Sequence, residues 1–189
     1  MKVERLRCAP LGTNLTQPSA LSRREARTSV DLRSKKEALY VVIFRQIEFG
    51  SEAYREACKL RNAVLRVPIG LNLFDEDLSL EKSQMHFALI DPAGLLIGCI
   101  IAVPLSSTDV KIRQMAVRPS HQRQGYGREI IRRLEHDLVR QGFTQVSMNA
   151  RLEAVPFYES LGYSTTGDDF VEVGIPHVRM QKTLACSGD

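Results

Sequence analysis

Hydrophobic and polar positions follow clear periods along the chain from residue 40 onward, and these periods predict the order of its elements. The β-branched and aromatic run at 40–44 predicts a strand. Ser51 can cap a helix that ends before Pro68, because apolar residues recur behind it at helical spacing, at Ala53, Ala57, Leu60 and Val64. A polar, irregular stretch follows to Gln84.

The second part of the chain predicts strands interrupted by two helices. A hairpin is expected at 85–90 and 95–105, because the turn-forming residues Asp91 to Gly94 separate two apolar runs. One parallel unit follows: strand 110–117, helix 127–141 and strand 144–150. A short helix within 154–163 and two strands around 170–174 and 177–184 complete an α/β or α+β domain with a mixed sheet.

The first 38 residues lack such periodicity and differ in charge. They carry nine basic and four acidic residues, whereas the rest of the chain carries 17 basic and 18 acidic ones. We expect residues 1–38 to form a basic, disordered extension and residues 186–189 a flexible tail. An organelle transit segment and a start codon placed too far upstream are alternatives for the extension.

Composition narrows the class of protein. The chain is 43% hydrophobic and 25% charged, as in ordinary globular domains, and no apolar run reaches the roughly 20 residues of a membrane span. Its four cysteines are far apart and have no histidines at metal-binding spacing. We therefore expect the protein to lie in the reducing cytoplasm, to bind no metal and to have no association with a membrane. Because the positive charge belongs to the extension, the folded part is not expected to bind nucleic acid.

Two glycines, Gly125 and Gly127, stand where the helix at 127–141 begins. Glycine destabilises a helix interior by roughly 1 kcal/mol relative to alanine, so this junction needs bare backbone. The unpaired N–H groups of a helix start attract anions, and Arg118, Arg123 and Arg128 add positive charge. The stretch predicts a phosphate-binding turn, but it lacks the third glycine of a dinucleotide fingerprint and the Gly-Lys-Ser/Thr of a P-loop. A tight turn without a ligand is the alternative reading.

The wider pattern resembles a known superfamily. Residues 122–127, QRQGYG, look like the Q/R-x-x-G-x-G/A signature of the GNAT acetyltransferases, and they follow a strand that ends in MAVRP, as in that family. Residues 156–163, PFYESLGY, resemble its F-Y-x-x-x-G-F/Y segment. The combination of LRNAVLRVPIGL, HF, RQMAV, FVEVGIPH and MQKTL is similar to the ElaA-like branch, over about residues 40–184.

This resemblance implies a fold and a co-substrate. Residues 39–185 would form a GNAT-like acyl-CoA N-acyltransferase domain. Its mixed, mostly antiparallel sheet would have about six to seven strands and a central, splayed parallel pair, flanked by about four helices. The implied donor is acetyl-CoA, bound with its pantetheine arm between the splayed strands and its pyrophosphate on the N–H groups of 123–128. The implied coenzyme A-binding residues are Met115, Ala116, Val117, Gln122, Arg123, Gln124, Gly125, Tyr126, Gly127, Arg128, Asn149, Phe157 and Tyr158.

The resemblance also implies catalytic roles in direct attack by an amine within a ternary complex. Tyr158 matches the family tyrosine that protonates the departing thiolate, although a packing role is the alternative. A backbone N–H near Val117 would bind the oxyanion. Glu172 and His177, which flank an expected turn at 174–176, are candidates for the base, as is His86; a chain of waters could serve instead. Arg61 and Arg113 could bind an acceptor carboxylate, or could form salt bridges. Asn149 could bind the pantetheine arm or cap a turn.

Three functions therefore stand at this point. The first is an N-acetyltransferase for a small-molecule amine, a peptide N-terminus or a protein lysine, compatible with a homodimer. The second is an acyl-CoA-binding sensor without turnover, because no base is evident. The third, a nucleic-acid-associated protein acting through the basic extension, is disfavoured because that extension lacks interleaved aromatic residues. The acceptor, the base and the oligomeric state do not follow from the sequence.

Overall fold

The computed structural model describes residues 42–185. The predicted N-terminal extension and C-terminal tail, and the first residues of the strand expected at 40–44, lie outside this range. The fold below is that of the described residues alone.

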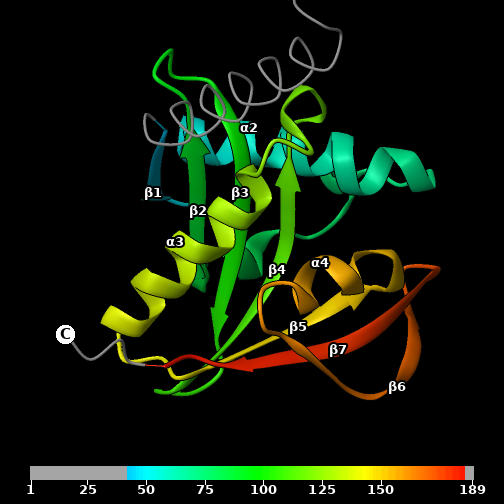
Figure 1. The fold of residues 1–189 in the computed structure, drawn as a ribbon. Coiled ribbons are helices and arrows are strands. Elements are labelled where there is room, and N and C mark those ends of the chain that lie inside the picture. Colours follow the sequence, from blue (N-terminus) through cyan, green and yellow to red (C-terminus); the bar gives the residue numbers. More distant parts are fainter. Residues whose placement is uncertain (1–41, 186–189) are drawn as a thin grey trace, which may run out of the picture. The chain divides into compact units, whose positions relative to one another are not determined.

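A seven-stranded mixed sheet forms the framework of the domain, in the order β1-β2-β3-β4-β5-β7-β6. Every neighbouring pair is antiparallel except β4 and β5, which are parallel. Figure 1 shows β4 and β5 side by side at one end and diverging toward the other. The strands are β1 (Ile43–Ile47), β2 (Met85–Ile90), β3 (Leu96–Pro104), β4 (Asp109–Val117), β5 (Gln145–Arg151), β6 (Ser164–Glu172) and β7 (Ile175–Thr183).

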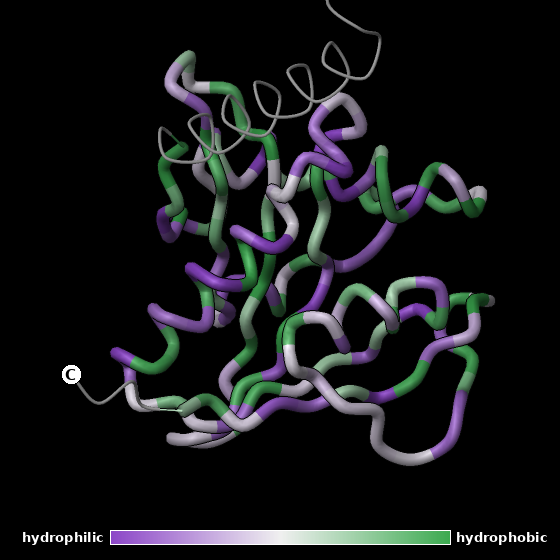
Figure 2. The backbone as a smooth tube through the Cα atoms, in the orientation of Figure 1, coloured by the Kyte–Doolittle hydropathy of each residue, from purple (hydrophilic) through white to green (hydrophobic). Residues whose placement is uncertain are grey.

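Three α-helices flank this sheet: α2 (Glu52–Arg61), α3 (Tyr126–Arg140) and α4 (Val155–Glu159). Ser51 caps α2, since its hydroxyl accepts a hydrogen bond from the Tyr54 N–H at 3.1 Å. One face of the sheet packs against α3 and α4 in the larger core, and the other packs against α2 in a second core. Figure 2 shows apolar and polar residues alternating along the turns of α3, as expected of a helix with one buried side.

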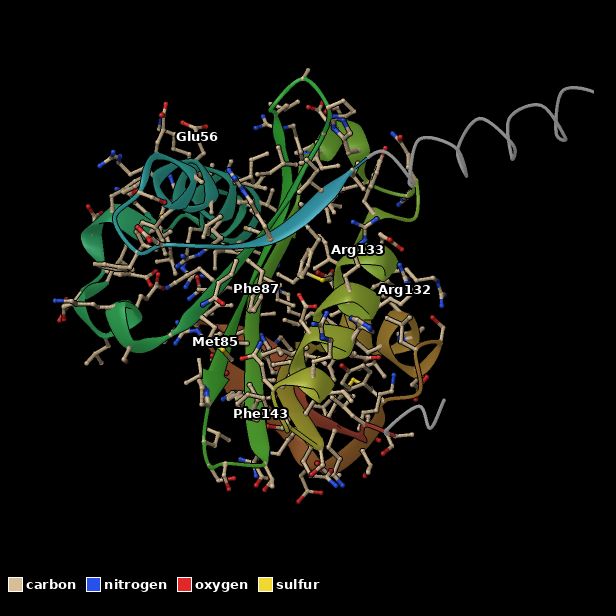
Figure 3. The ribbon with its side chains drawn as sticks, turned by 90° about the vertical axis from the view of Figure 1, so that its left-hand side faces the viewer. Glu56, Met85, Phe87, Arg132, Arg133 and Phe143 are labelled. Carbon is tan, nitrogen blue, oxygen red and sulfur yellow. The ribbon has the colours of Figure 1, made fainter. Side chains whose placement is uncertain are left out.

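Close packing and polar contacts attach α3 to the sheet. A Cβ on Gly98 of β3 would lie 2.5 Å from Ile130 Cδ1, so glycine lets the helix approach the strand. Arg133 Nη1 donates to the Val42 carbonyl at 2.8 Å, which joins α3 to the start of β1 (Figure 3). Glu129 pairs with Arg133, as its i,i+4 spacing predicts.

The observed elements agree with the periodicity except where the chain is polar. The strand 85–90 is confirmed residue for residue, and the helix expected at 127–141 is α3. The helix expected from Ser51 to before Pro68 is α2, continued by a π-helical turn, Asn62–Arg66. The stretch from there to Gln84 contains 3-10 turns that no period predicts, at Val67–Ile69, Leu73–Asp75 and Ser79–Ser83. Three α-helices, compared with about four expected, lie within residues 42–185.

Candidate active site

A pocket of about 540 Å³ opens where the parallel strands separate. β4 and β5 pair only from Asp109–Lys111 to Gln145–Ser147, and the pocket begins beyond that ladder. Its walls come from both strands, from the π-helical turn, from α4 and from the β6–β7 hairpin. The lining residues that the argument uses are Arg66, Lys111, Arg113, Met115, Asn149, Arg151, Glu153, Phe157, Tyr158, Glu172 and His177.

A β-bulge in β4 bends this strand away from β5. The register with β3 shifts between Cys99, opposite Ala116, and Ile101, opposite Arg113, so that β4 has one residue more than β3. Gln114 lies in the shift with φ of 51°, a left-handed conformation that few non-glycine residues adopt. The bulge ends the parallel ladder and frees one edge of each strand toward the pocket.

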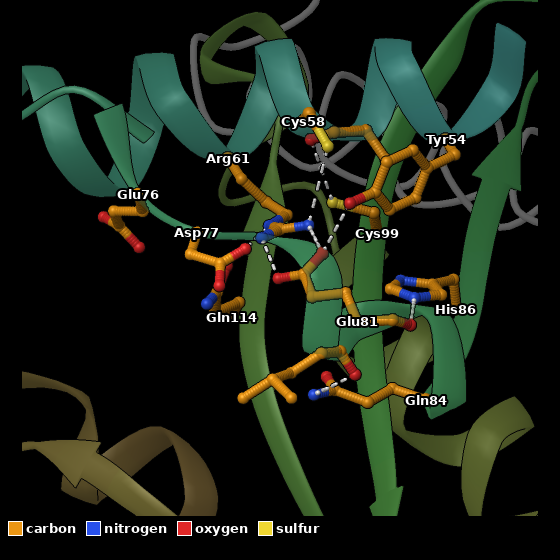
Figure 4. A network of polar contacts seen from close by, with 12 residues as sticks. Tyr54, Cys58, Arg61, Glu76, Asp77, Glu81, Gln84, His86, Cys99 and Gln114 are labelled. Carbon is orange, nitrogen blue, oxygen red and sulfur yellow. Dashed lines mark hydrogen bonds and ion pairs between the residues drawn. The ribbon is translucent and has the colours of Figure 1, made fainter. Parts of the chain in front are cut away.

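A buried ion pair holds the bulge against α2 (Figure 4). Arg61 is 1% exposed and donates from Nη1 and Nη2 to both carboxylate oxygens of Glu81, at 2.9 and 2.6 Å. Its Nε donates to Gln114 Oε1 at 2.6 Å. All three polar sides of the guanidinium are thus used, and the bulge residue is one of the partners.

The same network explains two other candidates from the sequence. Glu81 also accepts from the Tyr54 hydroxyl at 2.8 Å. Burial acts to raise the pKa of Glu81, but the hydrogen bonds and charge of Arg61 outweigh it and leave the pKa below its usual value. His86 is buried, and its Nε2 bonds the Glu81 carbonyl oxygen at 2.8 Å. Arg61 and His86 therefore belong to this network and do not line the pocket, whereas Arg113 does.

The loop between β4 and α3 presents unpaired N–H groups. A 3-10 turn, Pro119–His121, leads into Gly125, which precedes α3 with φ of 93° and provides no side-chain cap. Within residues 42–185, no hydrogen-bond acceptor is found for the backbone N–H groups of 123–128. The side chains of Gln122 and Gln124 point elsewhere and donate to the carbonyls of Val117 and Ser120. This geometry fits a phosphate-bearing substrate.

The two glycines of the loop differ in backbone conformation and in surroundings. Gly125 occupies the left-handed region, which is costly for other residues. A Cβ on Gly127 would lie 3.4 Å from Phe157 and 3.9 Å from Met115, at the inner wall of the pocket. These are ordinary van der Waals distances, so packing against α4 does not by itself require glycine at position 127.

Tyr158 of α4 faces the pocket from a largely buried position. Its side chain is 9% exposed, and its ring packs edge-on against Phe157 and Tyr163 at centroid distances of 5.0 and 5.8 Å. No described residue forms a hydrogen bond with its hydroxyl, and burial raises its pKa to about 12. The phenol is therefore protonated at every ordinary assay pH, as a general acid must be.

His177 and Glu172 line the same pocket from the β6–β7 hairpin. His177 Nδ1 contacts the Ile175 carbonyl oxygen at 2.8 Å, and because that oxygen only accepts, the neutral ring has its proton on Nδ1 and an accepting Nε2. Glu172 Oε2 accepts from Asn149 Nδ2 at 2.6 Å, so the amide of Asn149 orients this carboxylate. The turn between the strands is at Val173 and Gly174, not at 174–176 as the sequence indicated.

The structure thus brings together six of the predicted site residues: Met115, Asn149, Phe157, Tyr158, Glu172 and His177. The loop residues 122–128 form a separate part of the site, and Ala116 is buried against α2. Sequence reasoning missed Arg66, Lys111, Arg151 and Glu153 in the pocket wall. The alternation in VKIRQ, with Lys111 and Arg113 on the polar face, was the one signal that could have found Lys111.

Two absences concern only the described part of the chain. Between residues 42 and 185, no helix is long and apolar enough to cross a membrane. The same range contains no group of three or more His, Cys, Asp or Glu side chains that could hold a metal ion.

Comparison with solved structures identifies the fold. The aminoglycoside 6'-N-acetyltransferase complexed with coenzyme A matches with a TM-score of 0.63 at 16% identity, over 78% of this chain and 99% of that one. Escherichia coli ElaA matches with a TM-score of 0.62 at 16% identity, over 75% and 99%. At these identities the likeness establishes the GNAT fold alone. Since ElaA is one of several such neighbours, membership of the ElaA-like branch stays a prediction.

The chain belongs to the GNAT acetyltransferase family, since the family model described as "Acetyltransferase (GNAT) domain" matches residues 71–184, more than half of its length. The uncharacterized protein YyaT of Bacillus subtilis is 31% identical over 112 residues, which cover 59% of this chain and 74% of YyaT. Two further relatives from that organism are 35% and 36% identical, but the match spans only about half of their length, 49% and 52%.

Proposed function

We propose that this protein transfers the acetyl group of acetyl-CoA to an amine, in a ternary complex at the pocket between β4 and β5. One observation carries the proposal: the pocket lies along the part of β4 that is not paired with β5, and the loop with the unpaired N–H groups of 123–128 follows the end of this strand. An extended, phosphate-bearing thioester needs such a continuous path. Acetyl-CoA would supply an activated acyl group and a thiolate as leaving group.

The residues of the chain would bind and orient this substrate as follows. The N–H groups of 123–128 bind the pyrophosphate, with support from the positive end of α3. The free edge of β4 at Met115 and Val117 pairs with the pantetheine amides as an added strand would. Phe157, which lies beside Gly127 and packs against the Tyr158 ring, forms part of the pocket wall.

Proton transfer falls to the side chains that face the pocket. Tyr158, whose pKa is raised by burial, donates a proton to the departing thiolate. Glu172 and His177 both offer accepting atoms for the proton that the amine must lose. His177 offers Nε2, and Glu172 offers its carboxylate, of which Oε2 also accepts from Asn149.

The role of Tyr158 can be tested by removing its hydroxyl oxygen. We expect Tyr158→Phe to lower kcat by about 100-fold or more, because a positioned general acid contributes about 10²- to 10⁴-fold, while the KM for acetyl-CoA changes little. Release of the free thiol is followed with a panel of amines.

Tyr163→Phe is the matched control. It removes the same hydroxyl from the neighbouring ring, which bonds Glu135 at 2.8 Å and does not line the pocket, so kcat should stay near the wild-type value. Unchanged turnover in Tyr158→Phe would remove the assigned role. Tight binding of acetyl-CoA without turnover for any amine would favour a sensor instead of an enzyme.

A further inference from the structure

Two cationic side chains in the pocket have no anionic partner. Lys111 and Arg113 stand two residues apart on β4 and line the pocket, whereas Val110 and Ile112 between and beside them enter the core under α3. Within residues 42–185, neither the Lys111 side chain nor the Arg113 side chain forms a hydrogen bond or an ion pair. Like charges this close on one strand face repel each other, and a bound anion would relieve that repulsion.

The other two arginines that line the pocket, Arg66 and Arg151, already have anionic partners. Arg66 pairs with Glu76 at 2.5 Å, and Arg151 pairs with Glu153 at 3.8 Å and donates to the Leu65 carbonyl at 3.1 Å. These contacts fix the two guanidinium groups and compensate their charge. Among the described residues no comparable contact accounts for Lys111 and Arg113, so the uncompensated positive charge of the pocket is located on β4.

The opposite wall has the complementary character. Glu172 and the accepting Nε2 of His177 come from the β6–β7 hairpin, and β5 separates that hairpin from β4 in the sheet. One pocket therefore has a cationic wall on β4 and an anionic, proton-accepting wall on the hairpin. This polarity matches a molecule with an ammonium group at one end and an anion at the other.

We propose that the acceptor is a small primary amine that carries an anionic group, bound by Lys111 and Arg113 while its amine lies toward Glu172 and His177. This inference rests on the proposed acetyl transfer and names its class of substrate. Arg113 can bind a carboxylate or phosphate with two parallel hydrogen bonds, and Lys111 adds a second positive charge. Both residues act on specificity and take no part in the transfer of the acetyl group.

Matched amines test this class directly. Thiol release is measured with β-alanine against β-alaninamide and with O-phosphoethanolamine against ethanolamine. We expect kcat/KM to be at least tenfold higher for the member of one pair that carries the anionic group. The pair that shows this difference distinguishes a carboxylate from a phosphate. Removing the carboxylate also lowers the pKa of the amine and leaves more of it unprotonated, so intrinsic reactivity works against the expected result.

Charge reversal locates the preference on β4. Arg113→Glu should abolish the preference for the amine with the anionic group and raise the KM for that amine, while the KM for acetyl-CoA stays within about twofold. Arg55→Glu is the matched control, because Arg55 is exposed on α2 and does not line the pocket. Equal kcat/KM for the amines with and without an anionic group would overturn the inference and leave the acetyl transfer standing.

A binding measurement keeps the inference testable without turnover. N-acetyl-β-alanine and its amide, which resemble products, are titrated into the wild-type protein and into Arg113→Glu by calorimetry. Tighter binding of the carboxylate to the wild-type protein alone would support the inference. Equal binding of the two compounds would exclude a carboxylate, and together with equal kcat/KM for O-phosphoethanolamine and ethanolamine it would overturn the inference.

Discussion

Gly98 shows how a single missing Cβ positions the helix behind the site. A methyl group there would meet Ile130 Cδ1 at 2.5 Å and the Ala116 carbonyl oxygen at 3.2 Å. The first contact can be relieved by a side chain, but the second is backbone next to the β4 bulge. The close approach of α3 to β3 therefore depends on glycine at this position.

Gly98→Ala should lower the free energy of unfolding by about 1–3 kcal/mol, the usual range for an overpacked core. Ile130→Val removes the Cδ1 atom and should cost about 0.5–1.5 kcal/mol on its own. The double variant should cost less than the sum of the two, because the clash with Cδ1 is gone. Urea unfolding of the four proteins measures this coupling, and strictly additive costs would show that the two residues do not meet.

At the scale of the elements, the pocket depends on contacts between segments far apart in the chain. The bulge at Gln114 is held by Arg61 of α2, and Arg61 is balanced by Glu81 from a 3-10 turn. Each segment alone would leave a buried polar group without its partner, which is costly. The position of the bulge is thus a tertiary property.

Arg61→Met should lower the free energy of unfolding by about 3–5 kcal/mol, because Glu81 would remain buried without its counter-ion. Adding Glu81→Gln should recover part of this loss, since the amide is uncharged and still accepts from Tyr54. Lys59→Met is the control: Lys59 pairs with Glu56 on the exposed side of α2, where an ion pair contributes at most about 1 kcal/mol. Urea unfolding at neutral pH gives all four values.

The pH dependence provides a second readout for this pair. The pKa of Glu81 is lower in the folded protein than its usual value of 4.5, so its contribution is present above that value and is lost as the pH falls through the folded pKa. The wild-type protein should therefore lose more stability on acidification than the variant with Arg61→Met and Glu81→Gln. Equal acid sensitivity would contradict the assigned role of this carboxylate.

The same contrast explains which features the sequence could predict. Strands such as β2 and helix α3 follow from local periodicity, which the chain displays over six or more residues. Tyr158, Glu172 and His177 were found through the resemblance and are brought into one pocket. The bulge at Gln114 and the 3-10 turn with Glu81 have no local period, because contacts with other segments determine them.

At the scale of the whole described domain, the two cores share one property, the burial of tyrosine. Tyr54 lies in the core against α2, and Tyr158 and Tyr163 lie in the core against α3, each at most 9% exposed. Burial raises the pKa of all three, and the Glu135 carboxylate raises that of Tyr163 further. The folded state thus keeps these phenols neutral at pH values where the unfolded chain ionises them.

Alkali should therefore unfold this protein cooperatively. A group whose pKa is raised by folding stabilises the fold below its unfolded value, here about 10, and that contribution is lost as the pH rises toward the folded pKa, about 12 for Tyr158. Three such groups together cost about 4 kcal/mol for each pH unit above 10, so a domain with a stability of about 5–8 kcal/mol, the lower part of the ordinary range, should unfold between about pH 11 and 12. Tyrosinate absorbance and circular dichroism should change together in this range.

The composition makes this experiment clean, since the chain has five tyrosines and no tryptophan. Tyr163→Phe removes one of the buried phenols, and the transition should become less steep with pH, even though the bond to Glu135 is lost and the stability at neutral pH is lower. A gradual rise of tyrosinate absorbance while the circular dichroism stays native would show that the buried rings ionise within the fold. In that case the neutral Tyr158 required of a general acid would be confined to a narrower pH range than its burial indicates.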